Sequence, residues 1–514
     1  MKDERIRHTS ICTTFFYSFR IFCISHKYRK YKKIYNLYLK RYSMTMTMTT
    51  TTIVSYKSLI FVAFIIIHCA AGFENRQKQK CFIDCAIIGG GPAGLATAIA
   101  ISKSSPTSSV GIFERDSFQP KGASIQISSS GWKSLADLDS SVVPKLEDTG
   151  VAVTAVDLRS WTNIKEEEEK KNISMTRRSR LKNSIKKPLT KLKSIITQFI
   201  FSKVLRRTHL WHDVRVVLRQ HAEKLYTGDD SKSKATLINL NLNLENIQSL
   251  SPLGGSSSSS SSSRSNQDDD DEARFELIFK NVESGEEMKV RTNYVFACDG
   301  INSKVRSILP NEPDVLLSED KSVWRGMAAN IPTSTATFFR GQQDSDTVGR
   351  TALIFPGGKN AGSSWSVISD AEDGRANTDE ESRRRVLKVV ETMGTNSENY
   401  KRMKKVIDDS NIIIENKLYV RDFDKPWESS YDGLIYIGDS AHPVRPTGEG
   451  TALAFEDANV LGQVVSKYGL GVKALRQYEN ERYEPVKAIS EKVRTDVNNF
   501  YKQPNELMVG AATE

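Results

Sequence analysis

The chain has 514 residues, of which 39% are hydrophobic and 26% charged, so it is long enough for two or three domains with a sizeable core. Its formal net charge is +11, but residues 1–80 carry 15 Lys or Arg against 3 Asp or Glu, and the remainder is close to neutral. A surface for nucleic acid is therefore not predicted. The scattered cysteines favour neither a disulfide scaffold nor a metal site, and no metal ligand is predicted.

The start of the chain has the composition of a targeting region. Residues 1–43 form a basic leader, and residues 44–79 contain the apolar run LIFVAFIII and then Ala-Ala-Gly before Phe73. The run is shorter than the about 20 residues of a membrane span and fits a signal peptide, with an uncleaved anchor as the alternative. The chain is thus expected to enter the secretory pathway or associate with a membrane. The Ala-Ala-Gly ending also resembles bipartite plastid presequences, which would direct the protein to a plastid.

A strand, a glycine loop and a helix are predicted to begin the folded part. Phe82–Ile88 is apolar and rich in β-branched residues, and Ala93–Ile101 is a helix of small residues. The loop between them, GGGPAG, has the pattern G-x-G-x-x-G. Gly89 permits a tight turn, Gly91 lets a pyrophosphate approach the backbone, and Gly94 lets the helix pack on the strand. The helix N-terminus at Ala93 then presents free N–H groups to the phosphates.

A second strand ends in an acidic residue at the spacing of a dinucleotide-binding unit. The segment VGIFE places the Glu114 carboxylate 25 residues after Gly89. A carboxylate there accepts hydrogen bonds from ribose hydroxyls and repels a 2′-phosphate, so FAD or NAD is predicted as the bound dinucleotide rather than NADP. The adjacent Arg115 is included in this predicted site.

Two inserts are predicted before residue 280. The first, 165–206, is basic, and its stretch 185–206 has apolar residues on one helical face. Such a helix either lies on an anionic membrane surface or packs its apolar face on the protein. The second insert, 228–273, contains a run of serines followed by a run of aspartates, and it is predicted to be disordered.

Two later segments each place an aspartate and a glycine together after an apolar strand. YVFACDGINSKVR contains Asp299 and Gly300, and IYIGDSAHP contains Gly438 and Asp439. With the glycine loop they resemble the motifs of class A FAD-dependent monooxygenases, the family of hydroxybenzoate and salicylate hydroxylases and zeaxanthin epoxidase. The three motifs stand in the order of that family and span most of residues 81–490.

The resemblance implies roles for individual residues. It implies that Asp439 binds the ribityl chain of FAD and that the Asp299 segment serves both FAD and NADPH. Arg207, in the segment RTHL, is similar to the arginine of the family that contacts FAD. Gly448 and Gly450 precede an apolar helix whose N-terminus would point at the flavin. A histidine in the position of His442 usually belongs to the turn in this family, so no catalytic base is assigned.

One departure from the family pattern lies in the loop before that helix. The usual sequence is Pro-x-x-Gly-Gln-Gly, whereas this chain has Pro446-Thr447-Gly448-Glu449-Gly450. A negative charge at Glu449 opposes reduction of the flavin to its anion, unless the carboxyl group turns to solvent or is protonated.

The implied fold is α/β. A GR2-type FAD-binding Rossmann-like domain comprises residues 80–312 and 432–514, the second part ending in a C-terminal helix, and a β-rich substrate domain, 313–431, is interleaved between them. Within the substrate domain, alternating patterns predict strands and one amphipathic helix. These elements are Ser322–Ile331, Thr351–Phe355, Ser364–Ile368 and the helix Arg383–Met393. The aromatic residues of this domain line a pocket or, as the more ordinary role, pack in its core.

The resemblance also implies a reaction. NADPH or NADH reduces the bound FAD, and one oxygen atom of O₂ is inserted into an organic substrate, aromatic or isoprenoid. Two alternatives stay open at this point. One is a flavin-dependent reductase or dehydrogenase of the same fold, and the other is a non-enzymatic, membrane-associated flavin-binding protein, which the departure at Glu449 keeps in play.

Overall fold

A computed structural model gives the fold within the unit Lys80–Glu514. The structure describes residues 81–120, 123–161, 207–226, 237–250, 273–341, 349–370, 376 and 378–502. The basic leader, the signal peptide or anchor, the basic insert and the serine run lie outside these residues, so the interpretations of them stay predictions. Among the described residues, no helix is both long and apolar enough to cross a membrane.

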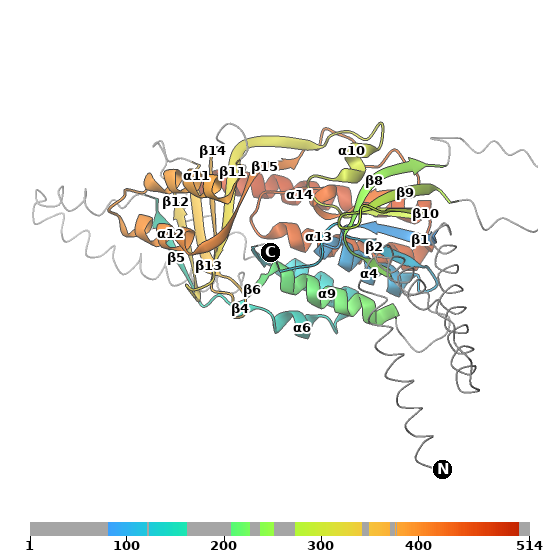
Figure 1. Cartoon of the computed structure of the whole chain (residues 1–514), viewed down its shortest axis with the longest axis horizontal. Coiled ribbons are helices and arrows are strands. Elements are labelled where there is room, and N and C mark those ends of the chain that lie inside the picture. The colour runs from blue at the N-terminus through green and yellow to red at the C-terminus, as the bar shows by residue number, and fades with distance from the viewer. Residues whose placement is uncertain are drawn as a thin grey trace, which may run out of the picture. The chain divides into compact units, whose positions relative to one another are not determined.

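The first sheet has seven strands in the order β7-β2-β1-β10-β9-β8, with β16 paired to β10 (Figure 1). Its strands are β1 (Cys81–Ile88), β2 (Val110–Phe113), β7 (Leu237–Asn239), β8 (Leu242–Ser249), β9 (Phe275–Asn281), β10 (Glu287–Ala297) and β16 (Leu434–Tyr436). Strand β1 is parallel to both of its neighbours, β2 and β10. The carboxyl ends of these strands therefore meet at one edge, where open α/β sheets bind their ligands.

Strand β1 is apolar because both faces of the sheet are covered. Cys85 and Ile87 belong to a core shared with helices on one face, whereas Ala86 and Ile88 belong to a core shared with β8, β9 and β10 on the other. The helices associated with this sheet are α4 (Pro92–Ser104), α5 (Ser129–Asp139), α6 (Val143–Glu147), α9 (Trp211–Tyr226), α10 (Lys304–Ile308), α13 (Glu449–Tyr468) and α14 (Val472–Lys502).

Small residues bring α4 and α13 close together. A Cβ atom added at Gly462 of α13 would lie 3.5 Å from the Cβ atom of Ala100 in α4. Leu95, Ile99 and Phe455 fill the same core with less than 1% of their surface exposed. This packing holds the N-termini of both helices beside the carboxyl edge of the sheet.

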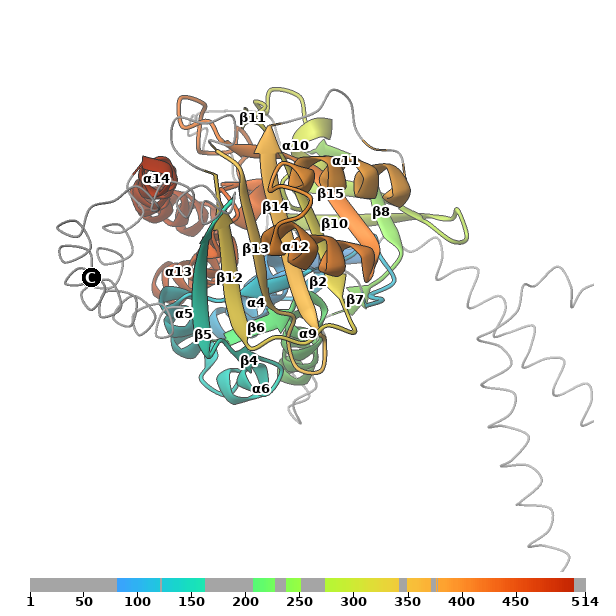
Figure 2. The same ribbon diagram turned by 90° about the vertical axis from the view of Figure 1, so that its left-hand side faces the viewer.

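The second sheet has six strands in the order β15-β11-β14-β13-β12-β5. Its strands are β5 (Ala155–Ser160), β11 (Leu316–Ala328), β12 (Thr335–Arg340), β13 (Thr351–Pro356), β14 (Ser363–Asp370) and β15 (Ser410–Arg421). Helices α11 (Asp379–Glu391) and α12 (Glu398–Asp408) cover one face, as Figure 2 shows. Trp324 and Val367 of the sheet are buried there against Val386 and Val406 of the helices.

Two short elements complete the part of the chain that bears the site. A small antiparallel sheet has the order β3-β6-β4, and the turn after β16 is the 3₁₀ helix η1 (Gly438–Ser440). The strands of the small sheet are β3 (Ser124–Gln126), β4 (Val151–Ala152) and β6 (Arg207–Leu210).

The predicted α/β fold with an interleaved β-rich domain and a helical C-terminus is confirmed. The strands predicted in the middle of the chain correspond to β11, β13 and β14, and the predicted amphipathic helix corresponds to α11. Strand β5 joins the second sheet from the first half of the chain by pairing in parallel with β12.

The predicted disordered insert over 228–273 is wrong for residues 237–249. These residues form β7 and β8, and the alternation of Leu242 and Leu244 with asparagines buries one side of β8 against the core. The serine and aspartate runs dominated the composition of the insert and concealed this period of two.

Candidate functional site

The glycine loop after β1 has the geometry that a phosphate cradle requires. Gly89 has φ of +103°, and a Cβ atom there would lie 2.5 Å from the carbonyl oxygen of Cys298. At Gly94 a Cβ atom would lie 2.0 Å from the carbonyl oxygen of Gly89, so only glycine fits. At Gly91 it would meet nothing within 4 Å, because this residue faces an open cleft. Gly91 is also the N-cap of α4 and has no side chain with which to cap its free N–H groups.

The Glu114 carboxylate lies beside this loop and is held by three donors. Its Oε2 atom accepts hydrogen bonds from Gly90 N at 2.8 Å and from Arg215 Nη2 at 3.2 Å, and its Oε1 atom accepts one from Asp116 N at 2.9 Å. A carboxylate has about four acceptor positions. One position on Oε1 is therefore left for a ribose hydroxyl, rather than the two that the sequence suggested.

Arg215 of α9 is the residue that fixes this carboxylate. Its side chain is fully buried, and its Nε atom donates to the carbonyl oxygen of Gly90 at 2.8 Å. The guanidinium lies between the rings of Phe118 and Trp211, 3.9 and 4.3 Å from their centroids. The charge of Glu114 is thus neutralised, and the glycine loop is tied to α9.

Asp299 and Gly300 follow β10 at the same edge of the sheet. The Oδ2 atom of Asp299 accepts a hydrogen bond from Val305 N at 3.0 Å, which leaves its Oδ1 atom buried without a partner among the described residues. Burial raises the pKa of this carboxyl group. Gly300 has φ of +81° and, like Gly91, has open space where a Cβ atom would lie.

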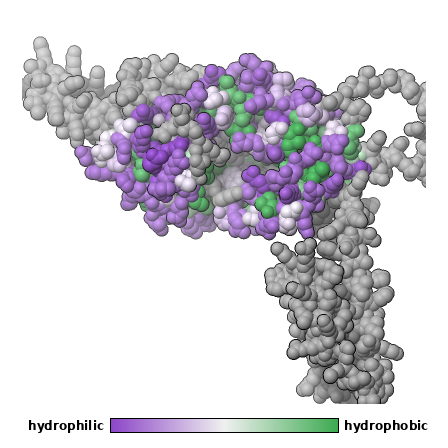
Figure 3. All heavy atoms as spheres, turned by 45° about the horizontal axis from the view of Figure 1, so that its top comes forward, coloured by the Kyte–Doolittle hydropathy of each residue, from purple (hydrophilic) through white to green (hydrophobic). Residues whose placement is uncertain are grey.

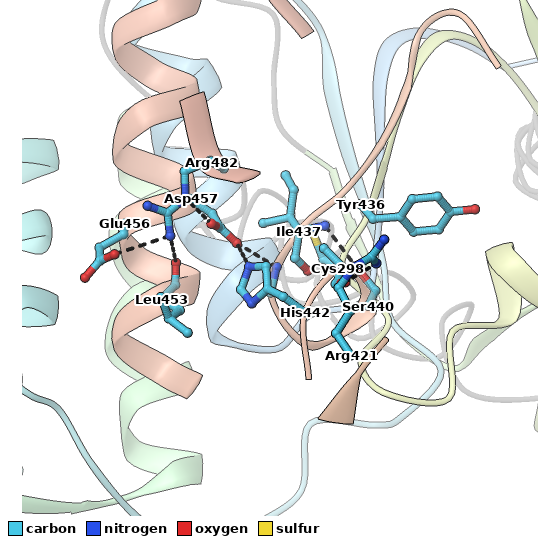
Figure 4. Close-up of polar contacts among 12 residues, drawn as sticks. Cys298, Arg421, Tyr436, Ile437, Ser440, His442, Leu453, Glu456, Asp457 and Arg482 are labelled. Atoms are coloured by element: carbon cyan, nitrogen blue, oxygen red, sulfur yellow. Dashed lines mark hydrogen bonds and ion pairs between the residues drawn. The ribbon is translucent and has the colours of Figure 1, made fainter. Parts of the chain in front are cut away.

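The turn that carries Gly438 and Asp439 is anchored by Asp457 of α13, whose contacts with His442 and Arg482 are drawn in Figure 4. One oxygen of Asp457, Oδ2, accepts from Gly438 N at 2.8 Å and contacts His442 Nε2 at 2.6 Å. Its other oxygen, Oδ1, accepts from Arg482 Nε at 2.7 Å. Burial alone would raise the pKa of Asp457, but His442 and Arg482 outweigh it and lower the pKa to about 2.

Asp439 points the other way, into the cleft. Its side chain is accessible from the cleft, whose walls surround it. Burial between these walls raises the pKa of the carboxyl group, and the nearby His442 and Arg325 lower it. His442 itself is buried against Asp457 and stacks on Trp427, with ring centroids 6.0 Å apart. It does not line the cleft, which agrees with a part in the turn and not with a catalytic base.

One continuous cleft of about 2190 Å³ connects these groups with the second sheet. Single ligands the size of drugs occupy pockets of roughly 300–1,000 Å³, so the cleft has room for a dinucleotide and a second molecule. The second-sheet wall presents Leu353, Phe355, Ile368 and Ile414, and it is largely apolar. Outside the cleft, hydrophilic residues cover most of the face in Figure 3, and apolar residues form separate groups.

The loop with the unusual glutamate closes one end of the cleft. Gly448 has φ of +100° and forms the N-cap of α13, so the helix N-terminus opens toward the cleft. Glu449 is the first residue of the helix and is partly buried rather than turned to solvent. Burial raises the pKa of its carboxyl group, and a hydrogen bond from Ser128 acts against this shift. Glu449 is therefore not turned fully to solvent, and its raised pKa shifts the carboxyl group toward the protonated form.

Most of the residues predicted from the sequence meet at this cleft. Those that line it are Gly89, Gly91, Ala93, Glu114, Arg115, Asp299, Gly300, Asp439, Gly448 and Gly450. Gly94 and Gly438 lie directly behind the lining and shape its two turns. Of the aromatic residues of the second sheet, Phe338 and Phe355 line the cleft, and Trp324 and Phe339 pack in the core. Trp365 borders the cleft but is fully buried in the same core.

Arg207 is the exception among the predicted residues. Its Nη1 atom donates to the carbonyl oxygens of Glu147 and Gly150, at 3.0 and 3.3 Å, and it does not line the cleft. Arg215 and Asp457 were not predicted, because each stands among ordinary helical residues and belongs to no motif. The only available signal was a charged residue on an otherwise apolar helical face.

Comparison with known proteins identifies the fold. Residues 248–493 match the family model of the FAD binding domain. No protein in a search of curated sequences matches the chain.

Solved structures with a similar fold match most of this chain. CtdE in complex with FAD and a substrate has a TM-score of 0.56 and 14% identity, covering 82% of this chain and 91% of CtdE. HpxO of Klebsiella pneumoniae, complexed with FAD and uric acid, has a TM-score of 0.52 and 18% identity, and the match covers 84% of this chain and 92% of HpxO. PqsL of P. aeruginosa, in complex with 2-aminobenzoylacetate, has a TM-score of 0.53 and 15% identity, and the match covers 84% of this chain and 100% of PqsL. At these identities the likeness establishes a shared fold.

The cleft fits FAD. Gly91 and Gly300 leave open space for a pyrophosphate and a ribityl chain, and Glu114 keeps an acceptor for a ribose. Two buried polar atoms in the lining, Asp299 Oδ1 and Gln126 Nε2, have no partner among the described residues. Buried polar groups are nearly always hydrogen-bonded, so a polar ligand is expected to supply these partners.

Gly91→Val should abolish tight FAD binding without unfolding the protein. The backbone of Gly91 is extended, with φ of −74°, and no protein atom lies near the new side chain, so the valine enters only the space of the ligand. Overpacking of about 1–3 kcal/mol corresponds to roughly a 10- to 100-fold loss of affinity. FAD titration followed by flavin fluorescence measures the loss, and thermal unfolding of the ligand-free protein is the control. A normal Kd in the variant would sink the assignment of the glycine loop.

Arg215→Lys and Arg207→Met separate the two arginines considered for the site. The lysine keeps a charge but loses the planar fork that spans Gly90 and Glu114, so FAD affinity should fall about tenfold. Arg207→Met should change the Kd for FAD by less than about twofold, because its partners are carbonyl groups outside the cleft. A larger loss in the Arg207 variant than in the Arg215 variant would show that the family resemblance assigned the contact correctly.

Glu449→Gln should make bound FAD easier to reduce. Removing a carboxylate at the helix N-terminus favours added negative charge, and the midpoint potential should rise by about 30 mV, equivalent to about 1.4 kcal/mol for two electrons. The difference between wild type and variant should shrink as the pH falls through the raised pKa of Glu449, because protonation removes the same charge. Potentials measured with reference dyes at several pH values test this. A constant difference across pH would mean that the carboxyl group does not titrate near the flavin.

Proposed function

We propose that the protein is an FAD-dependent monooxygenase, in which NADPH or NADH reduces FAD and one oxygen atom of O₂ passes to an organic substrate. The observation that carries the proposal is the single cleft, which joins a dinucleotide cradle to an apolar wall of the second sheet. A reductase that acts only on a nicotinamide has no need of a second apolar compartment beside the flavin. The resemblance to class A monooxygenases and the shared fold with CtdE, HpxO and PqsL support the same proposal.

The groups of the chain have binding and positioning parts in this activity. FAD, when bound, supplies the redox chemistry and the reaction with O₂. The first turn of α4 and Gly91 hold the pyrophosphate, Glu114 orients the adenosine ribose, and Asp439 accepts from the ribityl chain. The N-terminus of α13 would favour negative charge on a flavin ring placed beside it, and the Glu449 carboxylate would oppose that effect. The apolar side chains of the second sheet exclude water from the reacting end.

The proposed reaction is tested with the full chain loaded with FAD. NADPH and NADH are each added without oxygen while the flavin absorbance is recorded, and ¹⁸O₂ is then admitted with a panel of aromatic and isoprenoid compounds. Reduction of the flavin followed by one ¹⁸O atom in a product is the expected result. Reduction without ¹⁸O in any product favours a reductase or dehydrogenase, and no reduction by either nicotinamide favours a flavin-binding protein without catalysis. Gly91→Val is the control for reactions that do not need bound FAD.

A further inference from the structure

Strand β11 carries a bulge near its start. Its pairing with β15 stops at Ser318 and resumes at Ser322, so the three residues between them stand against a single residue of β15. Within the bulge, Asp320 has φ of +52°, a left-handed conformation that is unfavourable for a residue other than glycine. Bulges aim side chains in directions that a regular strand does not allow. The side chain that this bulge presents to the cleft is Glu319.

Glu319 forms an ion pair with Arg445, which belongs to the loop between η1 and α13. The two residues are 126 positions apart in the chain, and both line the cleft. Their side chains are only 9% and 16% exposed, so water screens the attraction between them less than it screens a pair on the open surface. The ion pair therefore joins the second sheet to a loop of the FAD-binding domain.

The backbone of this loop offers few hydrogen-bond donors, because Pro443 and Pro446 have no N–H group. The carbonyl oxygen of Pro443 accepts from the last residue of β15 at 2.9 Å, and Thr447 N donates to the carbonyl oxygen of Arg445 at 2.8 Å. The first contact holds the start of the loop, and the second closes a turn within it. The ion pair with Glu319 then fastens the middle of the loop to β11, just before the chain enters α13.

The next charged pair along β11 has a different arrangement. Lys321 lies 2.6 Å from Asp370 of β14, so both members of this pair belong to the second sheet. It lines the same cleft as Glu319 but does not connect the sheet with the loop. The two pairs thus separate the presence of charge in this wall from the attachment of the loop to it.

We propose that Glu319 is a positioning residue, which fastens the loop of residues 443–447 to the second sheet through Arg445 and thereby slows the release of FAD from the cleft. The loop leads into α13, whose N-terminus opens toward the cleft, so loss of the ion pair frees this side of the cleft to move. An arginine left without its carboxylate where little water reaches it is unfavourable, and the loop moves outward to hydrate it. The inference requires FAD in the cleft and does not depend on oxygen transfer.

The test is a double-mutant cycle on the rate at which FAD leaves the full chain. Loaded protein is diluted rapidly, and the appearance of free FAD is followed by its fluorescence. Glu319→Gln and Arg445→Gln should each speed the release about tenfold. The double variant should release FAD no faster than the faster single variant, because either change alone already breaks the pair. Lys321→Gln is the matched control on the same strand, and it should keep the wild-type rate because its partner lies within the second sheet.

Reversal of the two charges separates a specific ion pair from a general loss of stability. The variant with both Glu319→Arg and Arg445→Glu restores the attraction and should release FAD within about threefold of the wild-type rate. Thermal unfolding without FAD, recorded for every variant, should not follow the order of the release rates. Rates that multiply to about 100-fold in the double variant, a wild-type rate in either single variant, or no recovery on charge reversal would each overturn the proposal. Since neither O₂ nor NADPH is present, these results are independent of the reaction that the protein catalyses.

Discussion

The cleft depends on one buried carboxylate, that of Asp457. It accepts from the backbone of Gly438 and holds the side chains of His442 and Arg482, so it connects the turn after β16 with α13 and α14. Gly438 belongs to the backbone of the ligand-binding turn, and the side chains of His442, Asp457 and Arg482 are at most 4% exposed. Breaking a buried pair of this kind costs about 3–5 kcal/mol, a large part of the stability of a domain. The position of Asp439 in the cleft is thus set by a residue that never touches the ligand.

The same arrangement recurs at the other end of the dinucleotide cradle. Arg215 is buried without contact to solvent and fixes Glu114 as Asp457 fixes the turn beside Asp439. Glu114 faces the edge of the cleft and is held by Arg215 of α9. Asp439 faces the cleft, and its turn is held by Asp457 of α13. Because α9 and α13 both pack on α4, the two supports are parts of one rigid layer under the sheet. A ligand that bridges the glycine loop and the turn at Asp439 meets groups that are already placed, which lowers the entropy cost of binding.

Residues whose role depends on backbone geometry could be predicted from the sequence alone. Gly89, Gly91 and Gly94 could be assigned because each stands at a fixed offset in a strand-loop-helix unit. The structure shows contacts that exclude a Cβ atom at Gly89 and Gly94, and open space in front of Gly91. The strands of the second sheet could be assigned in part from alternation. Strand β5 could not, because its partner β12 follows almost 180 residues later and no local pattern encodes such pairing. Strands β7 and β8 were hidden by the composition around them.

The partners of the buried charged side chains could not be predicted from the sequence. Arg207 and Arg215 stand eight residues apart, at the start of β6 and within α9, and only the packing of α9 against the glycine loop decides which one reaches Glu114. The same holds on the opposite wall, where Lys321 and Arg325 lie on one strand but, among the described residues, only Lys321 is within ion-pair distance of a carboxylate, that of Asp370. Motifs fix where the cofactor lies because they constrain the backbone. Which charged side chains of the cleft form ion pairs depends on packing between distant segments, and no local motif encodes it.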